Sequence, residues 1–456
     1  MTPTERPSRP SSSRRLSAGF ALIAATLCFA QTGTTQQAEV SKIIITGEAA
    51  KFAIPPCVPR KPDPATTDAC GTVQTVLRSD LEFEGLFPFV PENLIAAVPA
   101  QNPDAPNFTD WQGIGAKYLV VTRAELSGGD LNVEVRVFFV DSGQTILAKR
   151  YSGKADNPRI FAHQASDDIV TLAQYRGVAR TRIAFVSDRA ASADRKGVKE
   201  LYIADYDGFN PRQVTVNGSL NILPAWSPDG RSLAYVSYRQ ERTPMIFLAH
   251  IFEGRSVANL TGEKANGQAF APAFSPDGKR IAYASNRSGN MDIWVANADG
   301  SSPRRLTSGA AQNTAPCWSP TGQEIAFTSD RTGTPQIYLM DADGLNVRRL
   351  TTVGSYNDAP AWNPSKQFSE IAYTARLEAG GFDIAVIDLA TRQVRQLTTG
   401  RGSCEYPSWA PNGRHLVFSC DRGNRKWEIT VSDRMGTVLR TLSTGPGNNV
   451  QPDWGP

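Results

Sequence analysis

One short phrase recurs six times between residues 224 and 454, and it constrains the fold more than any other feature of the chain. A proline stands two residues before an aromatic residue, and Ser-Pro-Asp-Gly or a near copy usually follows. The aromatic residues are Trp226, Phe274, Trp318, Trp362, Trp409 and Trp454, separated by steps of 48, 44, 44, 47 and 45 residues. A period near 45 residues predicts a repeat architecture.

The content of one period indicates which repeat this is. After Phe274 come three β-rich runs, at residues 280–285, 292–296 and 304–307. An Asp-Gly turn precedes the first of these runs, and another precedes the third. Together with the aromatic stretch the runs make four short strands, as in a propeller blade. No helical period appears between residues 182 and 456, which disfavours a solenoid of strands and helices.

The two ends of the repeat region complete one another. Residues 182–215 contain the last three strands of a blade without its aromatic phrase, and residues 451–454 contain that phrase with no blade after it. The sequence therefore predicts an all-β six-bladed propeller of WD40-like (PD40) repeats over residues 178–456. Its ring is closed by the C-terminal strand, which removes an exposed sheet edge.

The chain before the propeller divides into two parts. Arg14 and Arg15 precede an apolar run from Ala18 to Ala30 that is too short to span a bilayer, so residues 1–38 are interpreted as an export signal and flexible start. Residues 39–177 are predicted to form an α/β domain with a mixed or antiparallel sheet. Its expected strands lie at 40–45, 52–54, 118–126, 131–140 and 145–152, and its expected helices at 72–83, 108–116 and 158–174.

Cysteine usage fits an oxidising compartment. Cys57 and Cys70 flank a proline-rich stretch and are predicted to form one disulfide. Cys404 and Cys420 lie equally far from the hairpin turn at Asn412, which places them opposite each other on neighbouring antiparallel strands and predicts a second disulfide. Cys317 is left without a partner and is expected to be buried.

Several kinds of chemistry have no signature in this sequence. There is no Gly-x-Ser-x-Gly nucleophile elbow, no metal-binding His or Cys motif and no glycine-rich phosphate loop, and the chain has three histidines. The formal net charge is +4, and no basic stripe is interleaved with aromatic residues, so nucleic-acid binding is disfavoured. We expect no enzymatic activity, cofactor or resident metal. The alternative is a propeller that binds a small ligand or acts as a hydrolase. The sequence also does not decide whether acidic side chains in the channel bind a divalent ion.

The repeat also predicts a binding surface. The strand that carries each aromatic residue should run along the channel, so the residues just before its proline lie at one rim. Positions five and four residues before the aromatics are Asn221, Ile222, Ala269, Phe270, Asn313, Thr314, Asn357, Asp358, Cys404, Glu405, Asn449 and Val450.

Arginines recur in the loop after the second strand of each blade, which should return to the same rim. They are Arg189, Arg239, Arg287, Arg331, Arg376 and Arg422. Many of them are expected to pair with Asp188, Asp330, Asp421 or a carbonyl of the next blade. Phe270, Ile222 and Val450 at an exposed mouth suit a partner's apolar group.

The order of these parts carries a resemblance. An export signal, a small α/β domain and six blades closed by the C-terminus, with segments such as Asp-Tyr-Asp-Gly-Phe-Asn at 205–210, resemble the TolB family of the periplasmic Tol-Pal system. The resemblance implies a monomeric, non-enzymatic periplasmic adaptor that maintains outer-membrane integrity and supports constriction during cell division. It covers essentially the whole chain after the export signal.

The resemblance also implies partners. The peptidoglycan-associated lipoprotein Pal would bind the propeller rim, and other outer-membrane proteins are further candidates. The inner-membrane protein TolA would bind the N-terminal segment, at Glu39, Val40, Ile43, Ile44 and Ile45. Enteric relatives carry Thr-Glu where this chain has Thr314 and Ala315, so the resemblance does not extend to the detailed Pal contact, in which Asp358 or Glu405 could supply the missing carboxylate.

Overall fold

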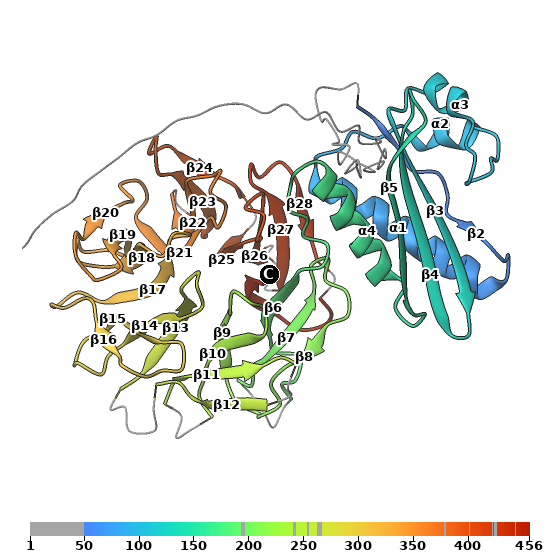
Figure 1. Cartoon of the computed structure of the whole chain (residues 1–456). Coiled ribbons are helices and arrows are strands. Elements are labelled where there is room, and N and C mark those ends of the chain that lie inside the picture. The colour runs from blue at the N-terminus through green and yellow to red at the C-terminus, as the bar shows by residue number, and fades with distance from the viewer. Residues whose placement is uncertain are drawn as a thin grey trace, which may run out of the picture. The chain divides into compact units, whose positions relative to one another are not determined.

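Two kinds of sheet make up the fold, a mixed sheet near the N-terminus and a series of antiparallel sheets after it (Figure 1). The computed structural model describes residues 50–192, 197–239, 243–252, 255–261, 267–377, 380–400, 402–421, 423, 426–442 and 444–456. The predicted export signal and the predicted strand at 40–45 lie outside these residues. Among the helices described, none has the length and apolar character needed to cross a membrane.

The mixed sheet has the strand order β1-β3-β4-β5, with β2 also pairing with β3. Both β1 and β2 run parallel to β3, and the other pairs are antiparallel. The strands are β1 Phe52–Ala53, β2 Val58–Pro59, β3 Tyr118–Ser127, β4 Asp130–Phe139 and β5 Gln144–Lys154. The helices are α1 Pro64–Glu84, α2 Glu92–Ala97, α3 Phe108–Gly113 and α4 Arg159–Leu172, of which α1 and α4 lie side by side against the sheet (Figure 1).

The first helix is longer than predicted. It begins at Pro64, eight residues before the expected start, because the Asp63 carboxylate accepts a hydrogen bond from the backbone N–H of Thr66 at 2.9 Å and caps the helix. Proline at the first helical position has no N–H to leave unpaired. Cys70 therefore lies inside α1, where it forms the predicted disulfide with Cys57. Helix α2 was not predicted.

Six antiparallel sheets of four strands follow in the described residues. Five of them are each formed by four consecutive strands of the chain. The first two sheets contain β9 Asn221–Trp226, β10 Ser232–Ser237, β11 Met245–His250 and β12 Arg255–Asn259, and then β13 Ala269–Phe274, β14 Arg280–Ser285, β15 Asp292–Asn297 and β16 Arg304–Arg305. The next three contain β17 Asn313–Trp318, β18 Glu324–Ser329, β19 Gln336–Asp341 and β20 Arg348–Arg349; β21 Tyr356–Trp362, β22 Glu370–Arg376, β23 Asp383–Asp388 and β24 Val394–Gln396; and β25 Ser403–Trp409, β26 His415–Asp421, β27 Trp427–Asp433 and β28 Leu439–Thr441.

The remaining sheet joins distant parts of the chain. It contains β6 Arg182–Ser187, β7 Glu200–Asp205 and β8 Arg212–Gln213, and the C-terminal strand β29 Asn449–Trp454 pairs with β6. The apolar cores lie between neighbouring sheets. In one of them, Phe327 of β18 belongs to the same buried cluster as Ala284 of β14 and Ile293 of β15. In β25 and β26, Cys404 pairs directly with Cys420, and the second predicted disulfide joins them with Cα atoms 4.1 Å apart.

The first strand of each sheet carries the same irregularity. Its register against the second strand shifts at the residue before the recurring proline, and that residue has a φ between 47° and 57° in all six strands. Proline has no N–H to donate to the ladder, which is why such a position accommodates a bulge. The six residues are Leu223, Ala271, Ala315, Ala359, Tyr406 and Gln451.

Candidate functional site

The predicted rim side chains occupy equivalent places in the six sheets. Ile222 pairs with Val236, Phe270 with Ala284, and the same register holds for Thr314, Asp358, Glu405 and Val450. All six of these side chains are half-buried. Because the first strands contact one another in succession, these side chains lie at the same end of neighbouring strands. The structure therefore brings together the positions four residues before the aromatics.

The positions five residues before the aromatics do not face outward. Asn221, Ala269, Asn313, Asn357 and Asn449 are at most 2 % exposed, which corrects the expectation that they contact a partner. The Asn221 amide donates to Glu200 of the preceding sheet at 2.9 Å, and the Asn313 amide donates to Asp292 at 3.2 Å. Asn357 and Asn449 also bond within the protein, to Gln336 and Gly445. These residues hold the loops of the rim.

The rim arginines pack on aromatic rings. Arg189, just after β6, lies 4.3 Å from the ring centroid of Tyr202 and also donates to the backbone carbonyl of Thr444 at 2.5 Å, a kind of partner that was expected. Arg239 lies 3.9 Å from the ring centroid of Phe247 and Arg376 lies 4.4 Å from that of Phe382. Arg287 stacks on Trp294, and Arg331 stacks on Tyr338 and donates to Asn313 at 3.0 Å. Arg422 lies outside the described residues. Such cation–π contacts hold the guanidinium groups against the aromatic rings.

Two of the cavities are lined by residues from more than one first strand. One, of about 570 Å³, is lined by residues from the first strands of all six sheets, including the bulged residues and the prolines that follow them. A second, of about 240 Å³, lies at the rim between β25 and β29, where Glu405, Tyr406, Trp427 and Val450 contribute to its wall. Within the described part of the chain, no group of three or more His, Cys, Asp or Glu side chains could hold a metal ion.

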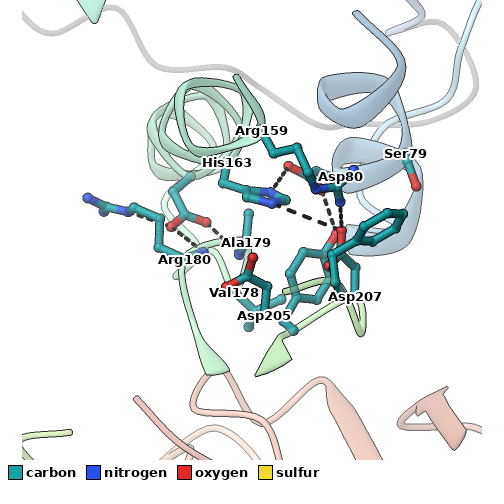
Figure 2. A network of polar contacts seen from close by, with 12 residues as sticks. Ser79, Asp80, Arg159, His163, Val178, Ala179, Arg180, Asp205 and Asp207 are labelled. Atoms are coloured by element: carbon teal, nitrogen blue, oxygen red, sulfur yellow. Dashed lines mark hydrogen bonds and ion pairs between the residues drawn. The ribbon is translucent and has the colours of Figure 1, made fainter. Parts of the chain in front are cut away.

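A buried polar network links the helices α1 and α4 to the propeller sheets, and the described residues belong to one compact unit. Figure 2 shows His163 of α4 between Asp80 of α1 and Asp207 of the turn after β7. The His163 Nδ1 lies 2.8 Å from the Asp80 carboxylate, and the Tyr206 hydroxyl donates to the other Asp80 oxygen at 2.6 Å. Arg159 pairs with Asp207. His163, Asp80 and Tyr206 are at most 4 % exposed.

A second group of contacts lies at the C-terminal end of α1. Glu84 accepts a hydrogen bond from the Val178 N–H at 3.0 Å and forms an ion pair with Arg414, just before β26. His415 Nε2 lies 2.9 Å from the carbonyl oxygen of Phe83. His415 is the first residue of β26, whereas the rim residue Glu405 pairs with Ser419, near the last residue of that strand. The contacts of Glu84 and His415 therefore lie at the end of the sheets opposite the rim.

Burial and charge set the protonation of these groups. Burial raises the pKa of Glu84 to about 7, although the charge of Arg414 acts against it, and burial lowers the pKa of His415 to about 4. For His163, burial disfavours the imidazolium, but the hydrogen bond and charge of Asp80, helped by Asp207, outweigh burial and the charge of Arg159 and raise the pKa.

We expect the substitution His163→Gln to lower the free energy of unfolding most below pH 6.5, by about 2 kcal/mol, because it removes a charge-assisted hydrogen bond to a buried carboxylate. A histidine whose folded pKa is raised stabilises the fold fully below its unfolded pKa, and this contribution is lost as the pH rises through the folded pKa. Urea unfolding of both proteins between pH 6 and 9 measures the difference, in which groups common to both largely cancel.

His250→Gln is the matched control, since the His250 ring bonds to the neutral side chain of Ser232 at 2.8 Å. The loss of unfolding free energy in His163→Gln should decrease as the pH rises from 6 to 9. A loss that stayed constant, or that increased with pH, would contradict the assignment of a charged His163.

Sequence reasoning missed this network. The three histidines match no catalytic or metal-binding motif in the sequence, and the partner of His163 is a residue 83 positions away. No local pattern marks such a pair. The one available signal is the spacing of Asp80 and Glu84, four residues apart, which puts both carboxylates on one face of α1, although Glu84 lies one residue beyond the helix predicted at 72–83.

Two family models match the chain. The model of the TolB amino-terminal domain matches residues 41–146, and the model of the TolB β-propeller domain matches residues 170–456. The chain is 35% identical to a Tol-Pal system protein TolB from Desulfosudis oleivorans over 241 residues, which is 51% of each chain. It is 36% identical to one from Anaeromyxobacter dehalogenans over 239 residues, 52% of each chain. The aligned regions thus span about half the length of these curated relatives.

A solved structure covers more of the chain. The crystal structure of TolB from Acinetobacter baumannii superimposes with a TM-score of 0.74 at 27% sequence identity. The match covers 89% of this chain and 96% of that one, so it includes both the mixed sheet with its helices and the series of antiparallel sheets.

Proposed function

The chain belongs to the TolB family, and from this premise we propose that it serves the Tol-Pal system as a non-enzymatic adaptor in the periplasm. The observation that carries the proposal is the succession, on one chain, of regions that match the TolB amino-terminal and TolB propeller domains. In this role the protein maintains outer-membrane integrity and supports envelope constriction during cell division. The proposed divisions are an export signal at 1–38, the N-terminal domain at 39–177 and the propeller at 178–456.

A closed ring of six blades is part of the proposal. It is supported by the pairing of the C-terminal strand β29 with β6, and by the contacts of the first strands, in which β9, β13, β17, β21, β25 and β29 each touch the next and β29 touches β9. A rigid ring presents loops in a fixed arrangement, so a partner can bind without first ordering them.

We place Pal on the rim and TolA on the N-terminal segment. The rim positions are supported by their shared register and their half-buried side chains, among which Phe270, Ile222 and Val450 are apolar. The opposite ends of the sheets contact α1, as His415 does, which leaves the rim as the end away from the N-terminal domain. The segment at 39–45 lies outside the described residues, and its assignment to TolA follows from the family.

The test is a calorimetric titration of the protein with the soluble domain of Pal from the same organism. We expect the double substitution Phe270→Asp, Thr314→Arg to weaken binding at least about 100-fold, since it puts two charges on the proposed contact surface. Leu345→Asp with Ser301→Arg, on exposed outer turns, makes the same kind of change elsewhere and should bind as the wild type does. Circular dichroism of each variant verifies the fold.

Each outcome leads to a different conclusion. An equal loss of Pal affinity in both double variants would remove the support for the rim as the Pal-binding surface. Undisturbed binding in the rim variant would move the interface to another surface. If the wild-type protein did not bind Pal, the adaptor proposal would fail, and a ligand in the cavity lined by the six first strands would become the better hypothesis.

A further inference from the structure

The rim is chemically divided into two halves. Following the contacts of the first strands, the half-buried positions occur in the order Val450, Ile222, Phe270, Thr314, Asp358 and Glu405. Three apolar side chains are therefore neighbours on β29, β9 and β13, and two carboxylates are neighbours on β21 and β25. The six sheets share one register but not one chemistry at these positions.

The two carboxylates differ in how they are held. Asp358 is fixed by hydrogen bonds from the Thr328 hydroxyl at 2.8 Å and from its neighbour Ala359 N–H at 2.7 Å. For Glu405, burial and then the negative charge of Asp358 raise the pKa. A positive charge placed beside Glu405 would favour its ionised form and so act against both effects.

The rim pocket lies where the two halves meet. Its volume is about 240 Å³, with Glu405 and Tyr406 of β25 on one side and Val450 and Gln451 of β29 on the other. The indole of Trp427 also lines it, and an aromatic face attracts a cation. Asp188 and Lys199 complete the charged lining, in which Asp188 already accepts two hydrogen bonds from Asn448.

Long basic side chains match such a pocket, because their aliphatic stems pack on apolar surface while their charged heads reach a carboxylate. We infer that this rim recognises a partner segment that presents a lysine or arginine to Glu405 and an apolar side chain to the half formed by Val450, Ile222 and Phe270. This inference rests on the proposed function, in which the rim binds a protein partner, and it adds the chemistry that the partner must supply.

The experiment uses the full mature protein and the soluble domain of Pal from the same organism, titrated in 50 and 300 mM NaCl. We expect Glu405→Gln to weaken binding about 10-fold at low salt and less at high salt, because salt screens the lost attraction. Phe270→Ala should weaken binding about 10-fold at both salt concentrations, since the lost contact is apolar. Val450→Ala provides a second apolar variant if Phe270→Ala unfolds.

Glu324→Gln is the matched control, because it removes a carboxylate at the start of β18, at the opposite end of the sheet, where Glu324 pairs with Arg348. Wild-type affinity and salt dependence in Glu405→Gln would overturn the inference while leaving the adaptor proposal intact, and tighter binding by that variant would indicate an acidic partner group instead. Absence of binding by the wild-type protein would overturn the proposed function itself, and the inference with it.

Discussion

Replacing Arg414 by alanine is expected to lower the free energy of unfolding by about 3–5 kcal/mol at pH 8, because it leaves the carboxylate of Glu84 buried without its cation. The Glu84 side chain is 1 % exposed and that of Arg414 is 12 % exposed, so water cannot replace the lost charge. Burial raises the pKa of Glu84 to about 7 even beside Arg414, and loss of that cation raises it further, so protonation of Glu84 relieves the variant as the pH falls. The deficit should therefore shrink as the pH is lowered from 8 to 5.5, which urea unfolding at the two pH values measures.

The surface ion pair of Arg348 with Glu324 is the matched control. Its side chains are 43 % and 31 % exposed, so Arg348→Ala should cost less than about 1 kcal/mol. Equal losses in the two alanine variants would show that the Glu84–Arg414 pair does not hold α1 to the start of β26. The combination Glu84→Leu, Arg414→Met should recover most of the loss, since it removes the unpaired charge as well as the pair.

Deleting residues 449–456 is expected to abolish cooperative unfolding. The deletion exposes the edge of β6, to which β29 is paired, and removes the buried Trp454, whose indole N–H donates to the Thr181 hydroxyl at 2.8 Å. It also removes Asp453, which accepts a hydrogen bond from the Trp226 N–H of β9 at 2.7 Å. Loss of one buried tryptophan costs about 3–5 kcal/mol, a large share of the stability of a typical domain.

Scanning calorimetry and gel filtration provide the readouts. We expect the truncated protein to aggregate through the open sheet edge, whereas Trp454→Ala should fold with its unfolding free energy lowered by about 3–5 kcal/mol. Pro456→Ala, at an exposed position beyond β29, should leave the stability unchanged and serves as the control. A truncated protein that melted cooperatively near the wild-type temperature would show that β29 is not needed to complete the sheet of β6, β7 and β8.

Local sequence patterns predicted the strands well and the roles of individual side chains less well. The run expected at 280–285 coincides with β14, because β-forming residues and the turn residues that bound them act over a few positions. The start of α1 was misplaced although Asp63 and Pro64 are a recognisable helix start. The rim asparagines were expected to face a partner, yet Asn221 is 0 % exposed, since its amide satisfies the carboxylate of Glu200 on the preceding sheet.

The sequence by itself determined the repeat, the four strands of each sheet and the pairing of distant cysteines, because period, turn chemistry and symmetry about a hairpin are local or periodic properties. The tertiary structure alone decided which polar groups became buried partners. His163 and Asp80 form a pair only because α4 packs beside α1, and Glu84 requires Arg414 only because the end of α1 lies against β26. The free energy of a buried charge depends on its surroundings in space, and those surroundings come from segments that are up to 330 residues apart in the chain.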